Sequence, residues 1–381
     1  YARREETYER AIQAYGEILA LYPEDPLANN GLGLIHGNTE EFEKAAERYE
    51  VSLKQPDAPY LYYNNFASAC ASQGKYDRAR EVLEKFLEKA PNSAQAHLHL
   101  ASIHRYEGRY DEALAEADKA FALDPTRSGI SGNMGTTALL KGDFARAEAE
   151  FQKEDEARVK AGMPSTGGGL MNLYMALGKY GQAIEQLSLS QDQARKVGEP
   201  AWLGPYNFFA SMSYRAAGRH PEAVKAAEES YRIAEASGDM MFMRFALWAK
   251  GIAQLESRAT AEAKKTAAEL KALIDRGMNK KEVRQHRDLQ ARIDLAEGRY
   301  AQAAENAKAA VDSLRPQSSS SRADAAYWDT LAKAYEASGD LQKARQAYEG
   351  LQKLTEGRSF SGHLYALSFY RLGLIAEKQG D

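Results

Sequence analysis

The chain has 381 residues, of which 44% are apolar and 27% charged, a composition that excludes an intrinsically disordered protein. Its 50 Lys and Arg residues against 54 Asp and Glu residues leave a net charge of −4, which argues against binding to nucleic acid or to an anionic membrane. The single cysteine, Cys70, excludes an internal disulfide. No apolar run approaches the ~18 residues of a membrane span, and no targeting segment is visible. The compartment, cytoplasmic or periplasmic, therefore stays open.

One short phrase recurs along the chain: glycine, any residue, an aromatic residue or leucine, two more residues and alanine. Its copies follow one another at intervals of 34 to 41 residues, and such a near-constant period is a strong repeat signal. The good copies are GKYDRA (74–79), GRYDEA (108–113), GDFARA (142–147), GKYGQA (178–183), GRHPEA (218–223), GRYAQA (298–303) and GDLQKA (339–344). A degenerate copy, RATAEA, occupies 258–263.

Elementary physical chemistry explains these residue types. Glycine suits the end of a helix because the chain there adopts a left-handed conformation. The small alanine allows the next helix to approach the first closely. Proline ends the second helix at Ala90–Pro91 and at Asp124–Pro125, because proline cannot continue a helix. The sequence therefore predicts an all-α chain of stacked helix–turn–helix units.

The repeat resembles the tetratricopeptide repeat, a helix–turn–helix unit of about 34 residues. The best match has Leu100, Ala101, Gly108, Tyr110, Ala113, Ala120 and Pro125 in register, and the resemblance covers essentially the whole chain. It implies a right-handed α-α superhelix of nine complete units with a half-unit at each end. Residues 8–26 are predicted to be a second helix without its partner, and residues 364–381 a first helix without its partner. We therefore expect a fragment of a longer array.

The repeat period divides the chain into two regimes. Residues 1–163 keep the period near 34, and residues 164–381 lengthen it to about 40. Both belong to one continuous solenoid in this interpretation. The loop GMPSTGGG at 162–169 is either a bend between the two sub-arrays or an ordinary connection between units.

The sequence does not indicate a catalytic or metal site. His97, His99 and His104 are separated by two and five residues, whereas metal-binding helices usually place their ligands four apart. We expect these histidines to pack between helices, and Cys70 to be a buried structural thiol. The chain is thus predicted to be no enzyme and to bind no cofactor.

In tetratricopeptide proteins the first helix of each unit lines the concave groove. The resemblance implies that Asn30, Asn64, Ser68, Arg105 and Asn172 face this groove. An asparagine amide both donates and accepts, so it can pair with the backbone of any peptide. The same asparagines could instead cap or solvate helix ends. The Lys and Asn set with which some members of the family clamp a carboxylate is not found here.

Two neighbouring first helices are unusually rich in aromatic residues and methionine, namely WLGPYNFFASMSY (202–214) and MMFMRFALWAKGI (240–252). Phe208, Met212, Phe245 and Trp248 are their candidates for an apolar groove that binds an amphipathic or apolar peptide. The alternative is that these side chains fill the core of the wider units, since stripes at helical spacing usually face inward.

Residues 276–292 carry six basic side chains against Glu282 and Asp288. This segment is either a docking site for an acidic partner or a solvated helix face.

The preferred function is a protein–protein interaction scaffold that holds a peptide or protein partner. The alternative is a regulatory arm of a bacterial signalling protein, such as a serine/threonine kinase or nucleotide cyclase, because the C-terminal half looks like the arrays appended to them. A second alternative is self-association, in which open half-units stack head to tail.

Overall fold

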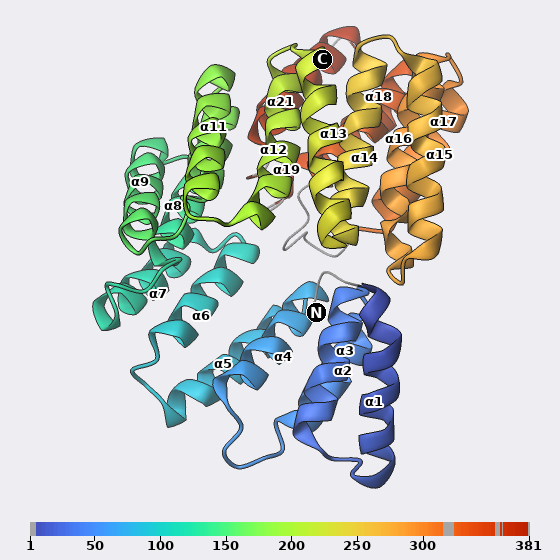
Figure 1. The fold of residues 1–381 in the computed structure, drawn as a ribbon. Coiled ribbons are helices and arrows are strands. Elements are labelled where there is room, and N and C mark those ends of the chain that lie inside the picture. The colour runs from blue at the N-terminus through green and yellow to red at the C-terminus, as the bar shows by residue number, and fades with distance from the viewer. Residues whose placement is uncertain (1–4, 315–323, 355–358, 360, 380–381) are drawn as a thin grey trace.

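The computed structural model describes residues 5–314, 324–354, 359 and 361–379. These residues form twenty α-helices and three short 3-10 helices, without any strand among them. Eighteen of the helices pair into nine hairpins, and α1 and α21 stand alone at the two ends of the array. The predicted all-α superhelix of nine units and two half-units is confirmed (Figure 1).

The N-terminal helices run through the lower part of Figure 1 and then up its left side, where α8 and α9 lie. Their bounds are α1 (Tyr8–Leu21), α2 (Pro26–Asn38), α3 (Phe42–Ser52), α4 (Tyr60–Ser72), α5 (Tyr76–Lys89), α6 (Ala94–Tyr106), α7 (Tyr110–Leu123), α8 (Ile130–Lys141) and α9 (Phe144–Lys160). The 3-10 helix η1 (Glu5–Thr7) precedes α1.

The C-terminal helices form the upper part of the same view. They are α10 (Gly168–Ala176), α11 (Tyr180–Lys196), α12 (Leu203–Ala216), α13 (His220–Ser237), α14 (Met240–Glu256), α15 (Thr260–Arg276), α16 (Val283–Ala296), α17 (Tyr300–Asp312), α18 (Asp324–Ala337), α19 (Leu341–Gln352) and α21 (Gly362–Gln379). The 3-10 helices η2 (Pro200–Trp202) and η3 (Lys280–Glu282) precede α12 and α16. The loop predicted at 162–169 lies between α9 and α10, although its last two glycines already belong to α10.

The recurring phrase forms the tight turn inside each unit. Each of its seven glycines has a positive φ, between 70° and 91°, and every alanine of the phrase is fully buried against the partner helix. Two units lack the glycine and place Glu40 (φ 60°) and Arg258 (φ 63°) in the same left-handed conformation. The phrase therefore carries both the turn and the close approach of the two helices.

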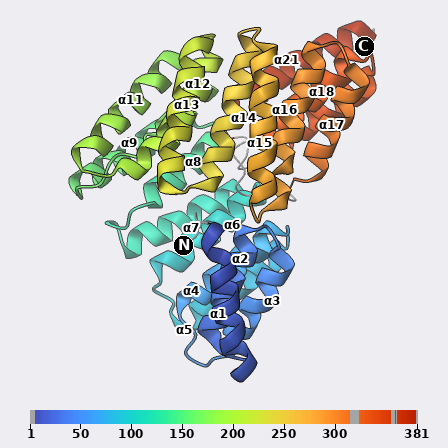
Figure 2. The ribbon, with the colours of Figure 1, turned by 45° about the vertical axis from the view of Figure 1, so that its right-hand side comes forward.

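The superhelix is wound tightly enough for distant units to touch. The last helix, α21, packs on α18 and α19 and also reaches α10, where a Cβ on Gly362 would lie only 2.5 Å from Cβ of Ala176. The first unit lies below the ends of α14 and α15 in Figure 1 and in the turned view of Figure 2. There it touches residues 277–284 between α15 and α16. The array is therefore closed on itself by contacts between residues more than 180 positions apart.

We predict that Gly135→Ala destabilises the fold by about 1–3 kcal/mol, because the added Cβ would lie 2.7 Å from the buried ring of Phe151. The matched control is Gly181→Ala in α11, where the new methyl group meets open space. This control should be neutral or stabilise the helix by up to about 1 kcal/mol. Urea unfolding followed by circular dichroism measures both changes, and equal stabilities of the two variants would contradict the packing.

Candidate functional site

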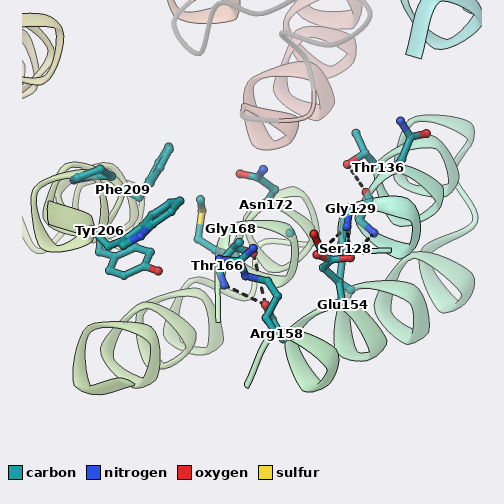
Figure 3. Close-up of a pocket in the computed structure, with 18 of the residues that line it drawn as sticks. Ser128, Gly129, Thr136, Glu154, Arg158, Thr166, Gly168, Asn172, Tyr206 and Phe209 are labelled. Atoms are coloured by element: carbon teal, nitrogen blue, oxygen red, sulfur yellow. Dashed lines mark hydrogen bonds between the residues drawn. The ribbon is translucent and has the colours of Figure 1, made fainter. Parts of the chain in front are cut away.

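A pocket of about 560 Å³ lies on the inner face of the superhelix, in the middle of the array (Figure 3). It is lined by the first helices α8, α10, α12 and α14, with α9 closing one side and Arg105 of α6 reaching its edge. The pocket has a polar half near α8 and α9 and an apolar half near α12 and α14. It is therefore built from four consecutive units rather than from one.

The main acidic side chain in the polar half of the pocket is Glu154 of α9. Its carboxylate accepts hydrogen bonds from the backbone N–H of Gly129, at 2.9 and 3.0 Å, and of Gly132, at 3.4 Å. These N–H groups begin α8, whose N-cap is a glycine without a side chain to offer. Glu154 thus caps a neighbouring helix and meets the positive end of its dipole. We assign it a structural role.

The loop beside the pocket is held by side chains from α9 and α12. Asp155 accepts from the backbone N–H of Thr166 at 3.1 Å, and Nε of Arg158 donates to the carbonyl of Pro164 at 3.0 Å. The hydroxyl of Tyr206 donates to the carbonyl of Ser165 at 2.6 Å, and burial raises the pKa of this tyrosine to about 12. This wall is fixed before any ligand arrives.

Two asparagines on adjacent first helices offer amide groups to the pocket. Asn172 of α10 is only 8% exposed, and its Oδ1 accepts no hydrogen bond from any described group of the protein. Asn133 of α8 donates to Oγ of Ser102 at 2.9 Å, while its Oδ1 is likewise without a donor in the described part of the chain. A buried acceptor left without a donor costs about 1–3 kcal/mol. Both oxygens are almost without accessible surface, so a ligand would reach them only after a shift of neighbouring side chains.

Aromatic and methionine side chains form the apolar half. Trp202 stacks on Tyr206 with ring centroids 6.1 Å apart, and the guanidinium of Arg158 lies 5.9 Å from the centre of the Trp202 ring. Phe209 of α12 and Met241 and Phe242 of α14 complete this wall. The pocket thus places a large apolar surface next to the amide side chains of Asn133 and Asn172.

The polar candidates from the sequence lie on the inner face, in three places. Arg105 and Asn172 line the pocket. Asn64 and Ser68 line a smaller hollow of about 280 Å³ between α4 and α6. Asn30 is buried and accepts a hydrogen bond from Nδ2 of Asn65 at 2.9 Å. The structure thus brings these residues together in two pairs, Arg105 with Asn172 and Asn64 with Ser68, and leaves Asn30 outside both hollows.

The apolar candidates require a correction. Phe208 (0% exposed), Met212, Phe245 and Trp248 (1% exposed) are buried in the hydrophobic core, not presented to the groove. Nε1 of Trp248 donates to Asp288 at 2.7 Å inside that core. The physical reason is that a first helix packs against its own partner and against both neighbouring units. Only a narrow stripe of each helix is left to face inward.

The residues that face the pocket lie at other helical positions than those selected from the sequence. Asn133, Gly169 and Phe209 all line the pocket, and each lies nine residues before the glycine of its unit. This spacing is the signal that could have identified Phe209 in place of Phe208. Asn133, Trp202, Met241 and Phe242 also line the pocket without being selected from the sequence.

The histidines and the cysteine have separate surroundings. Nδ1 of His97 lies 2.7 Å from Glu116, Nδ1 of His99 lies 2.5 Å from the hydroxyl of Tyr60, and His104 lies 3.8 Å from Glu107. Among the described residues no group of three or more potential ligands could hold a metal ion. Cys70 is fully buried, which raises the pKa of its thiol to about 11 and keeps it protonated.

The comparison with protein families decides which family this is. A model of the tetratricopeptide repeat matches residues 1–59, 65–128 and 289–363, slightly more than half of the chain. The chain belongs to the tetratricopeptide repeat family. Repeats of this family indicate a protein–protein interaction scaffold. In the described part of this tetratricopeptide protein, we find no helix with the length and apolar character that a membrane crossing requires.

Two curated relatives share part of the array. The Hsp70-Hsp90 organizing protein of Triticum aestivum is 30% identical over 93 residues, which are 24% of this chain and 16% of that protein. The human protein O-mannosyl-transferase TMTC1 is 30% identical over 114 residues, 29% of this chain and 13% of that protein. The chain therefore matches less than a fifth of the length of either relative.

Two solved structures are similar over most of the chain. The APC/C hetero-tetramer Cut9-Hcn1 has a TM-score of 0.46 and 15% identity, covering 97% of this chain and 75% of that one. The human IFIT1 dimer with PPP-AAAA has a TM-score of 0.48 and 14% identity, covering 91% of this chain and 86% of that one.

We predict that the stability of the tetratricopeptide array falls between pH 6.5 and pH 4. Burial, and then the nearby charge of Arg127, lowers the pKa of His99 from 6.5 to about 4. The unfolded chain therefore binds a proton in this window that the folded chain does not bind, and the stabilisation present above pH 6.5 is lost as the pH falls. The loss at pH 5 should be about 1–2 kcal/mol. Thermal unfolding of the native chain and of His99→Gln at pH 7.5 and pH 5 checks this: the variant should lose less stability, and an identical loss would contradict it.

Proposed function

We propose that this chain is a non-catalytic scaffold that holds an extended peptide segment of a partner protein on its inner face, with the pocket between α8 and α14 as the anchor. The observation that carries the proposal is that two asparagines without a donor for Oδ1, Asn133 and Asn172, line the pocket together with the apolar wall of Trp202, Phe209 and Met241. An extended peptide offers a backbone N–H and a side chain at once. The amides suit its backbone, and the apolar wall suits a large apolar side chain.

The fixed walls of the pocket favour this role. A loop tied at Thr166, Pro164 and Ser165 does not have to be ordered when a ligand binds, so less conformational entropy is lost. The charged residues Glu154 and Asp155 are already engaged with backbone N–H groups of the protein itself. They therefore leave selection to the amides and to the apolar wall. The smaller hollow at Asn64 and Ser68 lies on the same inner face and is suited to a continuation of the peptide.

One of the other roles predicted from the sequence uses the same surface. A regulatory arm of a bacterial signalling protein would recruit its partner through the inner face as a free scaffold does. This role and the head-to-tail self-association of the half-units stay predictions.

Asn172→Leu tests the proposed site. Replacing the Asn172 amide by an apolar side chain should leave the stability of the fold unchanged or slightly higher, because the substitution removes a buried acceptor that has no donor. Peptides selected from a random 12-residue library against the native chain should bind this variant roughly tenfold more weakly, a loss of about 1.4 kcal/mol. Titration calorimetry measures the affinity, and thermal unfolding measures the stability.

The matched control removes an amide elsewhere. Asn92→Leu, at an exposed turn, should bind the selected peptides with native affinity. Failure of the library to yield any binder, or equal affinity for the native chain and Asn172→Leu, would count against the proposed site.

A further inference from the structure

The first unit is joined to the α15–α16 connection by a buried ion pair across 244 sequence positions. The guanidinium of Arg284 donates to both carboxylate oxygens of Glu40, at 2.8 and 2.5 Å. The side chains of Glu40 and Arg284 are 2% and 5% exposed. Nζ of Lys281 donates to the backbone carbonyl of Glu40 at 2.6 Å, and Nδ2 of Asn279 lies 3.4 Å from its carboxylate. The basic segment that the sequence singled out thus binds an acidic residue of its own chain.

A second buried pair lies beside the first. Arg244 of α14 binds the carboxylate of Glu5, which also accepts from the backbone N–H of Met278 at 2.6 Å. Gly277 leaves room for this pair, because a Cβ there would lie 2.7 Å from Arg244 and 2.8 Å from Glu5. We call the contacts of Glu5 and Glu40 with residues 244 and 277–284 the clasp.

The backbone of Glu40 is in a left-handed conformation that most other units give to a glycine. Its φ of 60° occurs at the turn position where seven other units place a glycine. A side chain in this left-handed region costs of the order of 1 kcal/mol. Arg258 has the same conformation in another unit, but it is exposed and forms no ion pair with any described residue. At Glu40 the ion pair of the carboxylate with Arg284 offsets the cost of the left-handed backbone.

The clasp is mostly polar, which makes it easier to open than the packing within the array. Its apolar part consists mainly of Met278 against the cluster of Tyr8 and Leu32, and of Lys281 lying 5.9 Å from the centre of the Phe42 ring. Burying the charges of the two ion pairs, with Glu282 only 3.4 Å from Arg284, costs desolvation that offsets most of their attraction, and opening lets water reach these groups. Contacts between neighbouring units instead bury continuous apolar surface. Separating the first unit from residues 277–284 therefore costs less free energy than separating two neighbouring units of the array.

We propose that the clasp is a releasable closure of the superhelix that controls the peptide pocket. Arg244, which holds Glu5, lies two and three residues beyond Phe242 and Met241, the side chains that line the apolar end of the pocket. The pocket exists as a formed cavity while the clasp is closed. An open clasp takes the Glu5 carboxylate away from Arg244 and leaves this buried guanidinium unpaired, which disfavours the present position of the first turns of α14 and weakens the preorganised wall. By linkage, a peptide in the pocket also favours the closed clasp. This second half of the proposal rests on the proposed function, whereas the closure itself does not.

Glu40→Gly and Arg258→Gly form a matched pair that tests the closure without a ligand. Both variants replace a side chain in the left-handed conformation at the same turn position, but only Glu40→Gly removes a clasp carboxylate.

The separation of the two units is measured by pulsed electron–electron double resonance. Nitroxide labels are placed at two exposed positions, Glu43→Cys in α3 and Lys265→Cys in α15. Cys70 is fully buried and does not compete for the label. We expect a narrow distance distribution in the native chain and in Arg258→Gly, and a longer and broader one in Glu40→Gly. A native distribution in Glu40→Gly would overturn the clasp.

A charge exchange separates loss of the ion pair from general damage. Glu40→Arg and Arg284→Glu should each broaden the distance distribution, and the double variant should narrow it again. Broad distributions in all three, or in none, would overturn the assignment of this pair as the closure.

The coupling to the pocket is measured with the peptides selected on the native chain. Their affinity should fall severalfold in Glu40→Gly and stay native in Arg258→Gly, and peptide should narrow the distance distribution of Glu40→Gly. An open clasp with unchanged peptide affinity would overturn the control of the pocket while leaving the closure intact. If no peptide is selected, the control of the pocket falls together with the proposed function, and the distance measurements still decide the closure.

Discussion

Close packing of the two helices in each unit is the constraint on which the rest of this structure depends. It rests on the fully buried alanine of every repeated phrase and on the left-handed turn before it. Because each first helix then packs against its own partner and against both neighbouring units, only a narrow stripe of it faces the inside of the superhelix. Asn133, Gly169 and Phe209 occupy equivalent places in that stripe. The pocket is the point where small, amide and aromatic residues meet in successive units.

The second constraint is the tight winding of the array. Winding brings α21 against α10 and the first unit against residues 277–284, so the ends of the solenoid are not independent arms. These two closures differ in chemistry. Gly362 can pack closely on Ala176 because it has no side chain, whereas Glu40 and Arg284 form a buried ion pair. Small residues hold a contact by packing, and charges can be returned to water, which is why we assign reversibility to the polar closure.

The proposed function of this chain uses surfaces between units. The acidic residues of the pocket, Glu154 and Asp155, are occupied in holding α8 and the loop before α10. His97 and His99 have separate partners, Glu116 and Tyr60, and the cysteine is protonated and buried. Amide and aromatic side chains line the rest of the pocket, and it is this surface to which we assign the binding of a peptide.

The repeated phrase by itself determined the helices, the nine units, the half-units and the buried alanines, because glycine at the turn and alanine at the contact act within one unit. Periodicity alone did not determine which aromatic side chains face inward. Phe208 and Phe209 are neighbours in sequence, and only packing against adjacent units buries the first and leaves the second in the pocket. The pairing of Glu40 with Arg284 was decided by the tertiary structure alone, since the winding of the whole superhelix accumulates over many units before those residues meet.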